Sequence, residues 1–324
     1  FKQMRMPTGG DICTIPTDIE LMLPYTWRLP KKDLHFLAYI PWNDHYLTCI
    51  PDEYHDFFYY ILPHLSARTT NVHTALSVLQ LTMMLQHVKQ KVNKRQMYLA
   101  VMLHDCGWSE VSHQGIINSL NYSGVAPTAK SRKPKQQHVI FGEALAYKLL
   151  DAYDFKDDPL TSDDIFVITE IIRRHDCDAP WERGKFGEMT LEMQLVFDSD
   201  RLWSYTHENF WQDTVRKDVL PEAYLENLEA SIEVYFFTQY GRNQAKALLA
   251  IRRKEVETYL ETPHEQLVRK TLKKRMGEVG YNAYVKSYRQ LFNFPSRKDR
   301  SPALQAKRRV TTLIKRSLVL HKNG

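Results

Sequence analysis

An adjacent histidine and aspartate, His104 and Asp105, end an apolar run that begins near Tyr98. The run predicts a buried helix over residues 94–103, and Gly107 is a natural stop for it. An ionised carboxylate that is buried without partners is costly, so this pair needs a positive charge between its two side chains. A metal ion is the simplest such charge, and the rest of the chain should then supply further ligands.

Two further histidines continue the apolar faces of predicted helices. A helix expected from about Gln136 places His138 on the same face as leucines seven and eleven residues later. A helix that begins after Thr161 has an apolar face of isoleucines, and His175 continues that face. Both histidines are therefore expected to point inward.

Two more potential ligands lie before and after these helices. His73 lies one residue from the apolar face of a helix predicted from about residue 70 to Val92. Asp198 shares a face with leucines in a helix predicted from Thr190 to about Tyr205. A carboxylate among leucines again calls for a partner.

Together these residues predict a metal centre. A single histidine on an apolar face is more often a hydrogen-bonded core residue than a ligand, but here four of the 13 histidines agree within one region. Imidazole and carboxylate ligands suit Fe, Mn, Zn or Co, and the lack of a CxxC pair argues against a structural zinc site. Six ligands can hold two divalent ions if Asp105 bridges them, whereas one ion needs only the first two histidines and the two aspartates. The candidates are His73, His104, Asp105, His138, His175 and Asp198.

The elements that must position these residues are predicted to be helices, so the expected fold class is all-α. We find no convincing run of alternating strand residues. Further helical patterns cover 220–259, 263–294 and 304–320. The expected organisation is an N-terminal extension packed on the core (1–67), a metal core (68–215), a C-terminal helical region (216–294) and a basic tail (295–324).

Composition limits the class of protein. Hydrophobic residues make up 43% of the 324 residues and charged residues 25%, as in globular proteins. No apolar run of 18 residues and no signal pattern is present, so we expect no membrane partner and a cytoplasmic protein with reduced thiols. The net charge of +6 is uneven, because residues 265–324 hold 16 Lys and Arg against 3 Asp and Glu. This predicts an acidic partner such as nucleic acid, or simply a solvated basic helix.

The order of these residues resembles a known family. His73, then His104-Asp105, then the segment from Phe197 to Trp203 (Phe-Asp-Ser-Asp-Arg-Leu-Trp) is similar to the HD-domain superfamily of metal-dependent phosphohydrolases. The closing segment resembles one in which the first aspartate is the ligand, which selects Asp198 over Asp200. The added His138 and His175 resemble the branch that binds two metals. The resemblance covers roughly residues 68–205.

This resemblance implies cleavage of a phosphate ester of a nucleotide or related phosphorylated small molecule. Asp105 would bridge the metals and orient an activated water. Glu110 or His113 would be the general acid for the leaving group. A basic run in the polar loop before the helix of His138 would bind phosphates, or would be solvated; it consists of Lys130, Arg132, Lys133 and Lys135.

One position departs from the pattern. Many two-metal members carry a lysine in a His-Asp-x-Gly-Lys motif, and here that place holds Trp108. This departure favours an alternative within the superfamily, a diiron oxygenase like myo-inositol oxygenase, which activates dioxygen. A second alternative is a non-enzymatic nucleic-acid-binding module with a structural metal, which would contact phosphates through residues 295–324.

Overall fold

The computed structural model describes residues 42, 44–67, 70–112, 115–116, 119, 129–156, 158–176, 189–216 and 220–261, with scattered residues between 263 and 282. These residues form α-helices and short 3-10 helices and contain no strand, which confirms the all-α prediction. The basic tail and most of the N-terminal extension lie outside the described residues, so nothing tests their predicted roles.

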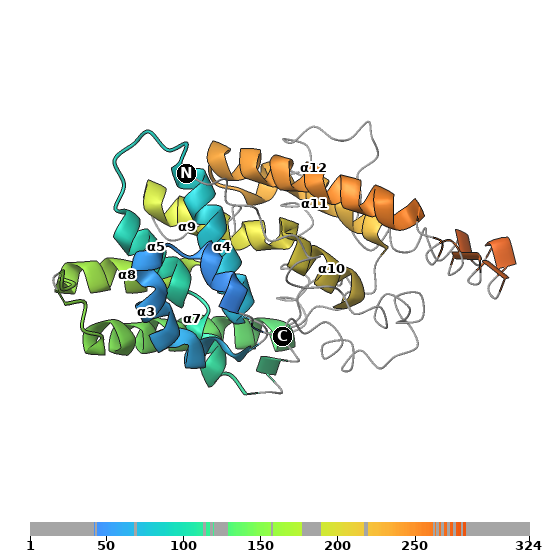
Figure 1. Ribbon diagram of the computed structural model, residues 1–324. Coiled ribbons are helices and arrows are strands. Elements are labelled where there is room, and N and C mark those ends of the chain that lie inside the picture. The colour runs from blue at the N-terminus through green and yellow to red at the C-terminus, as the bar shows by residue number, and fades with distance from the viewer. Residues whose placement is uncertain are drawn as a thin grey trace, which may run out of the picture.

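Fourteen elements follow one another in the described part of the chain (Figure 1). The short 3-10 helices are η2 (Asp44–Cys49), η3 (Asp52–Tyr54), η4 (Leu62–Leu65), η6 (Cys106–Glu110) and η8 (Trp203–Tyr205). The α-helices are α3 (His55–Ile61), α4 (Thr70–Leu85), α5 (Lys94–Leu103), α7 (Ala129–Ala152), α8 (Ser162–Arg174), α9 (Leu191–Leu202), α10 (His207–Arg216), α11 (Pro221–Tyr235) and α12 (Gln239–Glu261).

Three central helices, α4, α5 and α9, pack against one another. Helix α8 packs against both α5 and α7, and η6 lies against α7 (Figure 1). On the other side, α12 contacts α9 and α4 and runs beside α11. One continuous apolar core joins these helices, with fully buried side chains such as Leu79, Leu99, Ile171, Phe197 and Leu248. The predicted metal ligands lie on the helices that meet in this core.

Helix α8 begins where the sequence predicts. The Thr161 hydroxyl accepts a hydrogen bond from the backbone N–H of Asp164 at 3.1 Å, and the Asp164 carboxylate accepts one from the backbone N–H of Thr161 at 3.0 Å. This reciprocal cap satisfies two donors that a helix start leaves unpaired. Acidic residues in the first turn and Arg173 and Arg174 in the last turn complement the helix dipole. The cap therefore fixes the register that brings His175 to the end of the helix.

Helix α7 begins seven residues earlier than predicted. Gly115, Gly124, Pro127 and the run of basic residues predicted a loop up to Gln137, but the helix starts at Ala129 and continues through Pro134. Alanine, lysine, arginine and glutamine are strong helix formers, and here they outweigh one proline. The basic residues thus lie on the first two turns of a helix rather than in a loop.

The predicted helix over 220–259 is two helices. Helix α11 ends at Tyr235, and Phe236 takes an extended conformation before α12 begins at Gln239. At this break the backbone N–H groups of Phe237 and Thr238 donate hydrogen bonds to the carboxylate of Asp198 on α9.

Candidate metal centre

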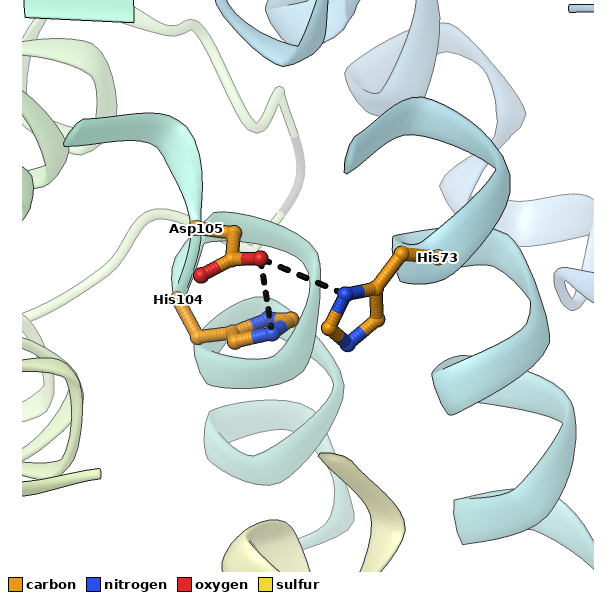
Figure 2. Close-up of side chains that lie close together, drawn as sticks. All are labelled: His73, His104 and Asp105. Atoms are coloured by element: carbon orange, nitrogen blue, oxygen red, sulfur yellow. Dashed lines mark ion pairs between the residues drawn. The ribbon is translucent and has the colours of Figure 1, made fainter. Parts of the chain in front are cut away.

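A first group of potential ligands joins α4 to the end of α5 (Figure 2). Asp105 Oδ2 lies 3.3 Å from His73 Nδ1 and 3.7 Å from His104 Nε2. Figure 2 shows the Asp105 carboxylate above the two imidazole rings, with His73 reaching in from the neighbouring helix. His104 and Asp105 are buried and His73 is partly buried.

A second group uses the other oxygen of the same carboxylate. Asp105 Oδ1 lies 3.6 Å from the Nε2 atoms of both His138 and His175. These two nitrogens are 3.3 Å apart, and both side chains are buried. Within each group the potential ligand atoms all lie within 4.8 Å of one another. Asp105 therefore stands between two adjacent sets of histidines, one on each of its oxygens.

The backbone holds the histidines at the two helix ends in a defined tautomer. His104 Nδ1 lies 2.6 Å from the carbonyl oxygen of Val101, and His175 Nδ1 lies 2.7 Å from that of Ile172. A carbonyl oxygen can only accept, so each Nδ1 carries the hydrogen and each neutral ring presents a bare lone pair at Nε2. In its neutral form each ring therefore turns the lone pair of Nε2 toward the carboxylate of Asp105, where a proton or a cation can bind.

Asp200, rather than Asp198, reaches this cluster. Asp200 Oδ1 lies 2.9 Å from His73 Nε2 and 3.5 Å from His104 Nε2. Two residues earlier on α9, Asp198 points toward the start of α12. Its Oδ1 accepts a hydrogen bond from the backbone N–H of Phe237 at 2.8 Å, and its Oδ2 accepts from the backbone N–H and hydroxyl of Thr238 at 2.8 and 2.7 Å.

The structure thus corrects the choice between these two carboxylates. Residues two apart on a helix project about 200° apart, so they cannot serve the same site. The leucines that share a face with Asp198 belong to the core, and so does Asp198 itself, which is fully buried. Asp200 therefore replaces Asp198 in the candidate ligand set.

Asp176, which forms a second His-Asp pair with His175 in the sequence, is a further carboxylate outside the predicted ligand set. Its Oδ2 lies 3.7 Å from His138 Nε2, and 36% of its side chain is exposed. Burial raises the pKa of Asp176, but Lys135 and the neighbouring histidines outweigh this effect and lower the pKa. The His175-Asp176 pair repeats the His104-Asp105 pattern, and that repetition was the available signal.

The charges of the cluster strongly shift its proton affinities. Burial disfavours the charged imidazole of His104, but Asp105 and Asp200 outweigh burial and raise the pKa of His104 to about 9. Burial likewise disfavours the charged carboxylates, yet the surrounding histidines hold the pKa values of Asp105 and Asp200 well below their usual range. The cluster therefore stabilises positive charge between its carboxylates.

This donor set fits a metal ion. In the described part of the chain His104 Nε2 has no hydrogen-bond partner, although it is buried and faces two carboxylates. A lone pair held against carboxylate oxygens is unfavourable unless a proton or a cation lies between them. Neutral imidazoles with fixed tautomers and ionised carboxylates are the ligands that Fe, Mn, Co and Zn accept. A buried cluster that can bind metal is therefore present.

The other predicted site residues are less well placed. Glu110 is exposed at the end of η6, and His113 lies outside the described residues. Lys133 and Lys135 are exposed on α7, while the side chains of Lys130 and Arg132 are not among those described. Of this set, the charge of Lys135 acts on the cluster through Asp176.

Comparison of the chain with protein-family models, with curated proteins and with solved structures found no match. Among the described residues, no helix is both long and apolar enough to cross a membrane. The fold and the cluster are thus the basis for assigning a function.

Proposed function

We propose that this protein is a metal-dependent phosphohydrolase of the HD-domain type, which cleaves a phosphate ester of a nucleotide or a related small molecule. The observation that carries the proposal is the position of Asp105, whose two oxygens face two separate sets of buried histidines. A shared carboxylate of this kind suits two adjacent metal ions. The proposed ligands are His73, His104, Asp105, His138, His175 and Asp200.

The order of these ligands along the chain supports the proposal. A histidine in one helix, a His-Asp pair at the end of the next, two further histidines and a closing aspartate resemble the two-metal branch of the superfamily. With Asp200 as the closing ligand, every member of the series lies in or beside the cluster.

When bound, two divalent ions would supply an activated water and would neutralise charge on the phosphate oxygens. The chain's own residues would then bind and orient the substrate. Lys135 lies on α7 three residues before His138, so the two side chains project on similar sides of the helix. Lys135 is exposed, and its positive charge lowers the pKa of Asp176, which lies beside the second group of ligands.

Lys133, two residues before Lys135, is also exposed on α7. We propose that Lys135 contacts the substrate phosphate, while Lys133, which projects about 200° away from it on the helix, contributes positive charge at longer range together with Lys130 and Arg132. Glu110 and His113, which follow the His-Asp pair, remain the proposed sources of a proton for the leaving group. A phosphate flanked by these cations favours nucleotides as the substrate class.

Metal content and phosphate release together test this function. The full chain would be loaded separately with Mn²⁺, Fe²⁺, Co²⁺ and Zn²⁺, its bound metal measured by mass spectrometry, and phosphate release followed on a panel of nucleoside mono-, di- and triphosphates. We expect about two ions per chain and release from at least one nucleotide. His104→Ala and Asp200→Ala should lose metal and activity together.

The matched control is His87→Ala, because His87 is an exposed histidine in the turn after α4. It should keep the metal and activity of the wild type. Metal-free wild-type protein after every loading, or unchanged metal in both ligand variants, would refute the proposed site.

A second candidate function, a diiron oxygenase, is favoured by one observation. Trp108 occupies the position at which many two-metal phosphohydrolases carry a lysine, and its side chain is buried against the cluster rather than free to meet a phosphate. Anaerobic loading with Fe²⁺ followed by measurement of oxygen uptake separates the two functions. Oxygen consumption with a diol or a phosphonate, without phosphate release from nucleotides, would select the oxygenase.

A further inference from the structure

Each half of the cluster contains one histidine that is stacked on a tryptophan. The ring of His73, in the first half, lies parallel to that of Trp203, with 5.0 Å between centroids and 2° between planes. The ring of His138, in the second half, lies parallel to that of Trp108, at 4.1 Å and 9°. Trp108 and Trp203 are both buried.

The four histidines therefore fall into two classes. His104 and His175 follow the last residues of their helices, and each is oriented by a hydrogen bond to a carbonyl three residues earlier. His73 and His138 lie within helices, and each ring is stacked on the flat face of an indole, while His73 Nε2 also makes a hydrogen bond with Asp200 Oδ1 at 2.9 Å. Each half of the cluster thus contains one ring of each class.

Trp108 makes a second contact with the cluster. Its indole Nε1–H donates a hydrogen bond to Asp105 Oδ1 at 3.1 Å, and this is the oxygen that faces His138 and His175. One side chain thus orients two candidate ligands of the same half. Asp105 Oδ2, which faces the other half, lies beside the rings of His73 and His104.

We propose that the two tryptophans are positioning residues that each control a different metal position. Trp108 orients the ligands of the position between Asp105, His138 and His175. Trp203 orients His73 at the position shared with His104 and Asp105. This inference rests on the proposed metal site, and it applies to any divalent transition-metal ion bound there.

The physical reason is the orientation of ligands by their outer neighbours. A ligand that is free to rotate must lose that freedom when metal binds, whereas a ring already held on an indole face is oriented beforehand. Loss of an outer partner typically weakens metal affinity roughly 10- to 100-fold. The two tryptophans touch different histidines, and Trp108 bonds only the Oδ1 atom of Asp105, although this carboxylate serves both positions. Each substitution should therefore weaken one position far more than the other.

Titration with Co²⁺ tests the proposal on the full chain. Isothermal titration calorimetry would give the affinities of the two positions, and quenching of tryptophan fluorescence would give an independent readout. Variants that keep only one metal position assign each affinity. His138→Ala should retain the position of His73, His104 and Asp105, and His73→Ala should retain the position of Asp105, His138 and His175. In the His73→Ala background, Trp108→Phe should weaken Co²⁺ binding roughly 10- to 100-fold, and Trp203→Phe should have no effect.

In the His138→Ala background the pattern should reverse. Trp203→Phe should weaken the remaining position roughly 10- to 100-fold, whereas Trp108→Phe, which removes only the hydrogen bond to the shared Asp105, should weaken it much less. The control is Trp211→Phe, since Trp211 is equally buried and also donates from Nε1 to a carboxylate, Glu255, at 3.2 Å. It contacts none of the candidate ligands among the described residues, so it should change neither affinity.

Circular dichroism would first establish that each variant is folded, with Trp108→Tyr and Trp203→Tyr as second variants if a phenylalanine is not tolerated. Two Co²⁺ ions in the wild type with affinities that neither tryptophan substitution alters would overturn the inference and leave the proposed function standing. Equal weakening of both positions by one substitution would also overturn it. A wild type that binds no Co²⁺, Mn²⁺, Fe²⁺ or Zn²⁺ would refute the proposed function itself.

Discussion

Gly107 allows the second half of the cluster to form, and its replacement by alanine gives a sharp test. A Cβ atom at this position would lie 2.0 Å from the carbonyl oxygen of His138 and 2.4 Å from the backbone nitrogen of Gly142. Both are backbone atoms of α7, which cannot rotate away as a side chain can. Gly107 is required for this close approach of η6 to α7, and it does not adopt a positive φ.

The size of the effect follows from the required movement. An ordinary contact for a Cβ atom begins at 3.4 Å, so α7 would have to move by about 1.4 Å relative to η6. Overpacking of this kind typically costs about 1–3 kcal/mol of unfolding free energy. His138 would move with α7, whereas metal–ligand distances tolerate only about 0.2 Å. Gly107→Ala should therefore be less stable and should lose the metal position of His138 before that of His73.

Gly142→Ala is the matched control, because it adds the same methyl group on the other side of the same contact. The nearest atoms to a Cβ at Gly142 are 3.4 and 3.6 Å away, which is ordinary van der Waals contact. Alanine inside a helix is also favoured over glycine by about 1 kcal/mol. This variant should be as stable as the wild type or more stable, and should bind both ions.

Denaturation with urea in the presence of a chelator, followed by metal titration of the refolded variants, measures both effects. The reasoning would be refuted by a Gly107→Ala protein with wild-type unfolding free energy and two wild-type metal affinities. It would also fail if Gly142→Ala were the more damaging of the two substitutions.

Three further predictions concern the aspartates, pH and metal removal. Asp200→Ala should abolish metal binding in the first position while the fold persists. Asp198→Ala should instead lower the unfolding free energy by on the order of 3 kcal/mol, because the buried N–H groups of Phe237 and Thr238 lose their acceptor. Urea denaturation and metal analysis of both variants distinguish these outcomes. Because the folded protein raises the pKa of His104 to about 9, the stability that this shift contributes to the metal-free protein is complete below pH 6.5 and is lost as the pH rises through about 9. Metal affinity should rise over the same pH range, since the metal must displace the proton of His104. Denaturation with and without Co²⁺ at pH 6 and 9 tests this, and the prediction fails if the stability of the metal-free protein and the metal affinity change in the same direction. Chelator should lower the thermal midpoint of the loaded protein, by an amount equivalent to about 2.7 kcal/mol for metal present at 100 times its dissociation constant. The decrease should be smaller in Asp200→Ala, which keeps only the second metal position.

The five ligand candidates that the structure brings together were accessible from the sequence for a simple reason. His104, His138 and His175 each continue an apolar helix face, and such a face must point into the core whatever the packing of the other helices. His73 lies beside such a face, and Asp105 follows His104 directly. Helical periodicity and adjacency thus predicted that these side chains point inward, the family resemblance predicted that they meet, and the structure brings them together.

The contacts between elements were not accessible in the same way. The stacking of Trp108 on His138 depends on how closely η6 approaches α7, and that approach depends on Gly107, which the sequence suggested only as a helix stop. The start of α7 was predicted too late because the run of basic residues was assigned to the preceding polar loop, although lysine, arginine and glutamine are strong helix formers. The distance between two packed elements depends on tertiary packing, and the residue pattern within one helix does not predict it.

Two aspartates on α9, Asp198 and Asp200, connect the C-terminal helices to the candidate metal centre. This helix is buried on several sides at once, so its apolar pattern could not tell which face meets the histidines and which meets α12. Asp198 bonds the backbone at the start of α12, and a Cβ atom at Gly241 would lie 2.5 Å from its Oδ2, so the two helices are in close contact. Asp200 leaves the same helix on the opposite side and reaches His73. Any change that displaces the start of α12 therefore acts on α9 and, through it, on the position of Asp200. Although the sequence resemblance ends near residue 205, the segment that follows residue 220 is part of what positions the last candidate ligand.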